Sequence, residues 1–476
     1  MKKIKIIFFA GVCISWGSCV YGQWEADTRI TDYPDYCDYG SFNNARTIAV
    51  RDTMVHIVWE HRDTVSSIGE LYYIRSVNSG TTFEPDTQLS PQNVHTPSIA
   101  VRDSIVHIVW YDYRAGNQEI YYKRSVDNGA SWGLDTRLTN NTAASYCPSV
   151  AVWDSVVHLV WYDERDGNYE IYYKRSVDNG ASWELDTQLT NNTAYSGFPS
   201  VAVCGSAVHI VWWDGRDGNY EIYYKRSIDN GVNWGPDTRL TNTASLSWYP
   251  SIAVRNSIVQ VVWHDSRNAG NYEIYYKRSV DDGVNWGPDT RLTNASADSY
   301  YPSIAVWDSV VHLVWNDARD GNDEIYYLWS VDNGLLWYPD RRLTNATGIS
   351  QYNSVACWDC SYGYDVHVVW TDLRDGNQEI YYKRHHCEET AVEEARVKKS
   401  ESVIVKESIV GGVRFGIYLA QAEVVTVNVY NVCGQLIDTR VLSLCAGENE
   451  FSWYHNKSGI YFFKFNNSIK IKAIVF

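Results

Sequence analysis

One short apolar string recurs along most of this 476-residue chain. Seven copies of "VHIVW" or a close variant end at successive tryptophans, with spacings of 51, 51, 51, 51, 52 and 55 residues. Self-similarity at a fixed period is typical of repeat architectures, in which each repeat is one supersecondary unit. The tryptophans are Trp59, Trp110, Trp161, Trp212, Trp263, Trp315 and Trp370.

Each repeat contains four strand-like runs separated by polar turns. The third copy reads "PSVAV", "VHLVW", "EIYYKRS" and "DTQLT", and its first two runs are apolar almost throughout, as strands covered on both faces are. A closed ring of such units buries both faces of each sheet and removes exposed sheet edges. The sequence therefore predicts an all-β protein whose main domain is a seven-bladed β-propeller of four-stranded antiparallel blades.

The ends of the repeat region predict how the ring closes. The seventh copy stops at Cys387 without its fourth run, and the region opens with "WEADTRIT" at 24–31, which matches "WGLDTRLT" at 132–139. We expect the strand at 24–31 to complete the last blade. The predicted propeller spans 23–387, followed by a charged linker at 388–402 and a small C-terminal β-sandwich at 403–476, where apolar residues alternate without the repeat.

The N-terminus and the charge restrict location and partners. The start, "MKKIKIIFFAGVCISWGSCVYGQ", has early lysines, an apolar run and a small residue at Gly22, which is the pattern of a secretory signal peptide over 1–22. We expect an exported mature chain without a transmembrane segment, because no later run of about 18 apolar residues follows. A net charge of -16 also argues against nucleic acid as a partner.

The turn between the third and fourth runs carries the string S-x-D-x-G-x-x-W, as in "SVDNGASW" at 125–132. The string is similar to the Asp-box of the bacterial neuraminidase repeat, and the domain resembles the Asp-box propellers that include sialidases. The Asp accepts N–H bonds across its own turn, the Gly permits a positive φ and the Trp buries a large ring. We therefore predict structural roles for Asp127, Asp178, Asp229, Asp281, Asp332, Trp132, Trp183, Trp234, Trp286 and Trp337.

The C-terminal domain resembles the type A sorting domain of the type IX secretion system. The resemblance rests on "VYNVCGQLI", "GENEFSW" and "SGIYFFKFNNSIKIKAIVF". It implies export through the type IX machinery to a secreted or outer cell-surface location in a Gram-negative bacterium. An ordinary adhesive β-sandwich is the alternative, because a fold alone does not set a function.

Candidate ligand-binding residues gather in the first repeat, which is the least repetitive. Its opening loop, "DYPDYCDYGSFNN", combines aromatic rings with carboxylates, which suit stacking on sugars and hydrogen bonding to them. Arg46 replaces the Pro of later repeats, close to where sialidases carry the Arg of their Arg-Ile-Pro motif, although Ile and Pro do not follow it directly. Arg46 is therefore the only catalytic candidate. The ligand-binding candidates are Asp32, Tyr33, Asp35, Tyr36, Asp38, Arg46 and Arg62.

Two further polar sets recur in the repeats. The turn "DERDGN" between the second and third runs suits local pairing of Arg with carboxylates, and a calcium loop or a ring of carbohydrate subsites is the alternative. The His of the second run is expected to be hydrogen-bonded, because Gln260 replaces it in the fifth copy. We expect no metal and no cofactor, and we expect ligands on the face opposite the Asp-box turns.

Catalysis by a retaining sialidase needs an asymmetric set of groups: three Arg, a Tyr activated by a Glu, and an acid/base Asp. The near-identical repeats supply these residue types without an evident single set of that kind. We therefore expect a non-catalytic module that binds an extracellular glycan or protein. A sialidase-like exo-glycoside hydrolase and a purely structural extracellular repeat protein remain as alternatives.

Overall fold

The computed structural model describes residues 24–33, 36–39, 46–63, 68–91, 93–268, 270–360, 363–386, 402–409, 412–419, 423–430, 436–444, 447–454, 459–465 and 469–475. The expected signal peptide at 1–22 and nearly all of the expected linker lie outside these residues. No helix in the described part of the chain is long and apolar enough to cross a membrane. Two compact units emerge, one of them Gly22–Cys387 and the other including Glu388–Phe476.

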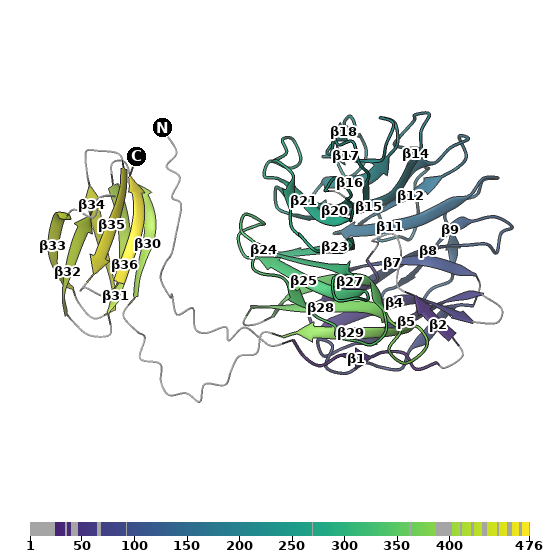
Figure 1. Cartoon of the computed structure of the whole chain (residues 1–476), viewed down its shortest axis with the longest axis horizontal. Helices are drawn as coiled ribbons and strands as arrows, with labels where there is room; N and C mark the ends of the chain where they lie inside the picture. The colour runs from purple at the N-terminus through teal and green to yellow at the C-terminus, as the bar shows by residue number, and fades with distance from the viewer. Residues whose placement is uncertain are drawn as a thin grey trace. The chain divides into compact units, whose positions relative to one another are not determined.

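The first unit is a ring of seven antiparallel sheets, which confirms the predicted propeller (Figure 1). We number the blades by the repeat that forms them. The first strand of each blade lines the central channel and the second packs against it. The first strands are β3 (Ile48–Arg51), β7 (Val94–Arg102), β11 (Ser145–Trp153), β15 (Ser196–Cys204), β19 (Ser247–Arg255), β23 (Ser299–Trp307) and β27 (Ser350–Cys360). The second strands are β4 (Met54–Asp63), β8 (Ile105–Asp112), β12 (Val156–Asp163), β16 (Ala207–Asp214), β20 (Ile258–Asp265), β24 (Val310–Asp317) and β28 (Gly363–Asp372).

The outer half of each blade consists of a third strand rich in Tyr and a very short fourth strand. The third strands are β5 (Gly69–Ser76), β9 (Glu119–Ser125), β13 (Glu170–Ser176), β17 (Glu221–Ser227), β21 (Glu273–Ser279), β25 (Glu324–Ser330) and β29 (Glu379–His385). The fourth strands are β6 (Thr87–Ser90), β10 (Thr136–Arg137), β14 (Thr187–Gln188), β18 (Thr238–Arg239), β22 (Thr290–Arg291), β26 (Arg341–Arg342) and, for blade 7, β1 (Thr28–Arg29).

Strand β1 comes from the N-terminal end of the ring and completes blade 7. It pairs antiparallel with β29, with Thr28 opposite Tyr382. The Ile30 amide donates to the Ile380 carbonyl at 2.8 Å, and Arg374 Nη1 lies 2.7 Å from Asp27 Oδ2. Main-chain bonds between residues about 350 positions apart therefore close the ring.

Bulky side chains of the second strands fill the space between neighbouring blades. The tryptophan that ends each "VHIVW" string is fully buried, and in blade 3 its indole Nε1 donates to Asp163 at 3.0 Å. Asp163 in turn accepts from Arg165 Nη2 at 2.7 Å. Because a buried indole N–H needs an acceptor and a buried carboxylate needs a cation, this chain of bonds explains the recurring W-x-D-x-R spacing.

Blade 1 departs from the predicted four strands. An additional strand, β2 (Tyr36–Tyr39), pairs with the Glu60–Asp63 end of β4, while β3 pairs with the other end of β4. Blade 1 therefore has five strands, and the four-strand prediction is correct for the other six blades. The difference arises because the opening loop of the first repeat is long enough to form a strand of its own.

The first strands of blades 2 to 7 each contain a bulge near their start. In β11, for example, the register with β12 shifts between Tyr146 and Ser149. The bulge holds one residue at a positive φ, a conformation that costs free energy for any residue with a side chain. These residues are Thr96, Cys147, Phe198, Tyr249, Tyr301 and Tyr352.

The second unit contains two antiparallel sheets. One sheet comprises β30 (Ser402–Ile409), β31 (Gly412–Leu419) and β34 (Gly447–Tyr454). The other has the order β33 (Leu436–Leu444), β32 (Glu423–Tyr430), β35 (Gly459–Phe465) and β36 (Ile469–Val475). Trp453 Nε1 of the first sheet donates to Asp438 Oδ2 of the second at 2.8 Å. This is the small β-sandwich predicted from the alternating pattern.

Candidate functional site in the central channel

The S-x-D-x-G-x-x-W turns, which we call box turns, use their polar groups internally. In blade 2, Asp127 Oδ1 accepts from the Ser125 hydroxyl at 2.6 Å and from the Ser131 amide at 2.9 Å. Hydrogen bonds from Ser125 and Ser131 lower the pKa of the Asp127 carboxyl to about 2. The Ser125 Oγ also accepts from the Gly129 amide at 2.8 Å. The carboxylate therefore stabilises its own turn.

The box turns also join neighbouring blades. Gly129 has a φ of 77°, and a Cβ at this position would overlap the Tyr73 hydroxyl of blade 1. The Trp132 ring meets the same tyrosine edge to face, with ring centroids 4.8 Å apart. The same contacts recur around the ring, as between Trp183 and Tyr122. The geometry assigns the box residues to construction of the blades.

The polar side chains of the turns between the second and third strands also bond to groups within the same blade. In blade 3, Arg165 bridges Asp163 and Asp186 at 2.7 Å and 2.8 Å, and its guanidinium lies 4.2 Å from the Tyr172 ring centroid. Asn168 donates to the Asn192 carbonyl at 3.0 Å. Among the described residues, no group of three or more His, Cys, Asp or Glu side chains is arranged to hold a metal ion.

The recurring histidine of the second strand is a hydrogen-bonded core residue. His158 Nδ1 lies 2.7 Å from the hydroxyl of Tyr173. Burial lowers the pKa of His158 to about 3, so the imidazole is neutral in the folded protein. In blade 5 the Tyr276 hydroxyl donates to Gln260 Oε1 at 2.9 Å. The glutamine thus performs the same task as the histidine.

The ligand-binding candidates of blade 1 do not form one cluster. Asp32 pairs with Arg29 at 2.7 Å, and the Tyr33 hydroxyl donates to Asp86 at 2.6 Å. Asp32 and Tyr33 line a cavity of about 480 Å³ between β1 and the turn before β6. Asp35 lies outside the described residues, and only the backbone of Tyr36 and Asp38 is described, in β2.

Arg62 lies elsewhere, at the junction of blades 1 and 2. Its Nε donates to Glu60 Oε1 at 2.9 Å, and its Nη2 lies 3.2 Å from His95 Nδ1. Glu60 is almost fully buried, and His95 Nδ1 is 3.1 Å from the same carboxylate oxygen. Glu60 and His95 were not predicted from the sequence. Glu60 follows Trp59 directly, and blade 1 has His61 and Asp63 where the other blades have the Asp and Arg of the W-x-D-x-R spacing.

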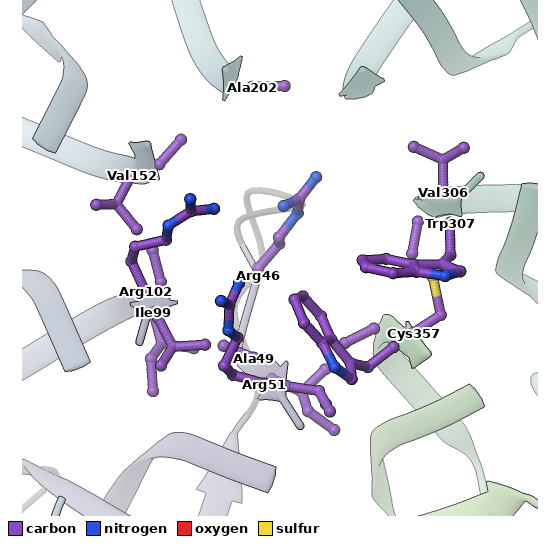
Figure 2. A pocket seen from close by; sticks show the side chains of 18 of the residues that line it. Arg46, Ala49, Arg51, Ile99, Arg102, Val152, Ala202, Val306, Trp307 and Cys357 are labelled. Atoms are coloured by element: carbon purple, nitrogen blue, oxygen red, sulfur yellow. The ribbon is translucent and has the colours of Figure 1, made fainter. Parts of the chain in front are cut away.

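Arg46 points into the central channel (Figure 2). Its Nη2 donates to the Ile252 carbonyl of blade 5 at 3.3 Å, so the side chain reaches across the ring. Within the described part of the chain, no carboxylate pairs with Arg46. Burial lowers the pKa of the guanidinium, as desolvation of a cation must. The group nevertheless keeps its charge, because arginine remains protonated in proteins.

A cavity of about 270 Å³ extends along the channel from Arg46. Its lining is aliphatic in the middle and combines arginine with tryptophan at the ends of the first strands (Figure 2). No Asp, Glu, His or Tyr is among the lining residues in the described part of the chain. Cys357 is a free thiol there, and burial raises its pKa to about 12, so it is neutral. The rim residues are Arg51, Arg102, Trp153, Arg255, Trp307 and Trp358.

Each of the three rim arginines lies over a rim tryptophan. Arg51 lies over Trp358 at 4.5 Å from the ring centroid, and Arg102 lies over Trp153 at 4.9 Å. Arg255 covers Trp307 at 4.4 Å. The rings of Trp307 and Trp358 are themselves 4.5 Å apart. Such cation–π contacts hold each arginine against its ring.

The rim belongs to the same face as the box turns. In blades 2 to 6, the turn after the first strand bonds to the box turn of the same blade: the Asn128 amide donates to the Ser104 carbonyl at 2.8 Å, and the Asn179 amide donates to the Ser155 carbonyl at 2.8 Å. The rim end of the cavity therefore lies on the face opposite the one on which we expected ligands, while Arg46 stands at the other end of β3. That expectation rested on polar loops whose side chains, as in blade 3, are already engaged with one another.

Sequence reasoning missed the rim arginines and tryptophans, although a signal was present. The residue before the first turn of each repeat reads Arg, Arg, Trp, Cys, Arg, Trp and Trp from blade 1 to blade 7. The positions beside it are nearly constant. Variation at one position of an otherwise regular repeat indicates that this position does not serve the contacts that every blade shares.

Comparison with solved structures supports the fold. An ulvan lyase of polysaccharide lyase family PL25, described as bound to -[GlcA(1-4)Rha3S]-, shares 11% identity at a TM-score of 0.53, over 75% of this chain and 95% of its own. The polysaccharide lyase Uly1 shares 10% identity at a TM-score of 0.51, over 77% and 100%. Trypanosoma rangeli sialidase shares 12% identity at a TM-score of 0.45, over 81% and 84%.

At these identities the two lyases establish the propeller fold and nothing about activity. The sialidase aligns too loosely to carry an argument. No protein-family model matches the chain, and no curated protein matches its sequence. The function must therefore be argued from the site.

Proposed function

We propose that this protein is an exported, non-catalytic binding module whose propeller takes an extracellular glycan. The observation that carries the proposal is the lining of the central cavity. Arginines and tryptophans there offer charge-assisted hydrogen bonds and stacking surfaces, which are the means by which proteins hold sugars and their charged substituents. A purely structural protein has no need to hold an unpaired arginine in its channel.

The same lining argues against catalysis at this place. Cleavage of a glycosidic bond needs an acid and a base or nucleophile within hydrogen-bond reach of the reacting atoms. Among the residues that the structure describes, the lining contains no carboxyl, imidazole or phenol group, and the Cys357 thiol is neutral. A catalytic role for Arg46 therefore lacks the groups with which a sialidase arginine works.

One observation supports a sialidase-like glycoside hydrolase as the second candidate. Glu60, Arg62 and His95 form a bonded cluster at the junction of blades 1 and 2. A carboxylate and an imidazole in contact are suitable for general acid/base catalysis. The cluster lacks an adjoining cavity among those described, so we rank it below the channel.

The export part of the proposal rests on sequence. The expected signal peptide, and the resemblance of the C-terminal β-sandwich to type IX sorting domains, support delivery to the surface of a Gram-negative bacterium or to its surroundings. The box turns likewise support membership of the Asp-box propellers. The partner of the C-terminal domain would be the type IX secretion machinery.

Two measurements on the propeller test the binding proposal against the enzyme. Acidic polysaccharides are the first class to examine on a glycan array, since the ulvan lyase was described with a uronate-containing sulfated saccharide. We expect binding to the array and no turnover of a fluorogenic sialoside. Turnover that Glu60→Gln abolishes would establish the hydrolase, and an array without any bound glycan would contradict the proposed function.

A further inference from the structure

We infer that the central channel is an oxyanion site, which holds the carboxylate or sulfate group of an acidic sugar on Arg46, while the next sugar of the glycan lies against the arginine–tryptophan rim. The inference rests on the proposed function only for the sugar. The anion site is a property of the channel and is tested without any glycan.

The charge balance of the channel is the first argument. Arg46 and Arg255 have no carboxylate partner among the described residues. Arg51 pairs with Asp103 at 2.9 Å and more distantly with Asp52 at 3.9 Å. Arg102 pairs with Asp154 at 3.0 Å. These carboxylates are at least 71% exposed. Exposed pairs contribute little. The interior of the channel is therefore positive although the chain as a whole carries a charge of -16.

The position of Arg46 is the second argument. Desolvation of its guanidinium costs free energy that one hydrogen bond to the Ile252 carbonyl, at 3.3 Å, does not recover. An anion in the cavity would supply the missing charge and accept the guanidinium hydrogens that point into open space. Guanidinium groups suit carboxylate and sulfate oxygens because their donors form a planar fork.

Size and shape restrict the occupant. The cavity volume of about 270 Å³ lies below the range of about 300–1,000 Å³ that is typical of sites for drug-sized ligands. It suits one charged substituent or one sugar ring rather than an oligosaccharide. Trp153, Trp307 and Trp358 at the rim are half-buried and present rings on which the next sugar stacks.

The test measures anion binding by isothermal titration calorimetry, with sodium sulfate and sodium glucuronate as probes and glucose as the neutral control. We expect both anions to bind the wild-type propeller with an affinity that falls with ionic strength, and glucose not to bind. Arg46→Gln should weaken anion binding at least tenfold. The matched control is Arg137→Gln, whose arginine pairs with Glu119 at 2.6 Å on the outer strand β10, and it should bind as the wild type does.

Thermal unfolding without added anions checks that the variant folds. Removing a half-buried arginine that has no carboxylate partner among the described residues should leave the melting temperature unchanged or raise it, whereas removing a structural arginine should lower it. Arg46→Lys keeps the charge without the planar fork and should retain part of the affinity. If Arg46→Gln folds and binds both anions as tightly as the wild type does, the site is overturned.

The outcomes separate this inference from the proposed function. Arg46-dependent binding of sulfate or glucuronate, with a blank glycan array, would support the oxyanion site and contradict the glycan-binding function. Glycan binding that Arg46→Gln leaves intact would support the function and overturn the site. Binding of sulfate but not glucuronate would assign the site to sulfate groups, and the reverse would assign it to uronic acids.

Discussion

The box turns and the channel rim lie on the same face of the propeller and follow opposite rules. The five intact box turns repeat the same residues and, in the copies compared, the same bonds, as in Asp127 and Asp178 with their serines. The position that forms the rim varies among the blades: it is Arg in blades 1, 2 and 5, Trp in blades 3, 6 and 7, and Cys in blade 4. A contact that must form at every blade junction is kept constant, whereas a site that binds one ligand on the ring axis need not be symmetric.

The two regions also differ in whether their charged groups have partners within the protein. In the box turns, the carboxylate accepts hydrogen bonds from its own turn and needs no partner from outside. In the channel, Arg46 faces a cavity in which no described residue supplies a counter-ion. The constant regions should therefore determine stability and the variable region should determine binding. Three perturbations of the constant regions test this division, from the largest expected effect to the smallest.

Removal of residues 24–31 should cause the largest loss. Without β1, blade 7 loses its outer strand, and the bonds that join Asp27 to Arg374 and Thr31 to Glu379 disappear. We expect a fall in melting temperature, measured by differential scanning calorimetry, larger than that of any single substitution described here. The control Asp32→Asn, at an exposed position just beyond the strand, should leave the transition unchanged. An unaltered transition in the deletion variant would contradict closure by this strand.

Mild acid should cause the next largest loss, through the buried histidines. His56, His107, His158, His312 and His367 each have a pKa lowered to about 3 by burial, against about 6.5 in the unfolded chain. Their stabilisation is complete above about pH 6.5 and is lost as the pH falls toward 3, because only the unfolded chain takes up protons. At pH 5 the loss is on the order of 2 kcal/mol for each histidine.

Urea titrations at pH 7, 6 and 5 measure this loss. His107→Gln should unfold with a shallower pH dependence, since Gln260 shows that the tyrosine partner accepts an amide. A free energy of unfolding that is constant from pH 7 to 5 would show that these histidines are solvated. It would contradict their burial between the blades.

The smallest of the three effects distinguishes a glycine of a box turn from a glycine of another turn. Gly129 and Gly167 both have a positive φ, 77° and 91°, but a Cβ on Gly167 meets nothing within 4 Å. We expect Gly167→Ala to cost about 1 kcal/mol from backbone strain. Gly129→Ala should cost about 2 kcal/mol more, because its methyl group overlaps Tyr73. Equal losses in urea unfolding would mean that the box turn is not held against the neighbouring blade.

Much of the fold follows from spacing and chemistry that are visible in the sequence. The intervals between Trp59 and Trp370 predict the blades, and the match of 24–31 with 132–139 predicts the strand that ends blade 7. The extra strand β2 was not predicted, because Tyr36–Tyr39 lacks the apolar alternation of a blade strand. It pairs with the end of β4 that β3 leaves unpaired, and this vacant edge exists only once the blade has folded.

The candidate site was predicted only in part, for a physical reason. Arg46 was singled out, but its surroundings arise from ring closure, which brings it to Ile252, 206 positions away. The rim residues precede turns and look like ordinary surface positions in a single repeat. They form a common rim only when the ends of the first strands meet around one axis in the closed ring.

The most direct test of the channel as a binding site is a crystal structure of the propeller grown with selenate, an oxyanion visible by its anomalous scattering. The account predicts an anomalous peak in the channel within hydrogen-bonding distance of the Arg46 guanidinium, and no such peak in Arg46→Gln crystals grown in the same solution. A wild-type channel filled only with water, with selenate bound elsewhere or not at all, would contradict it.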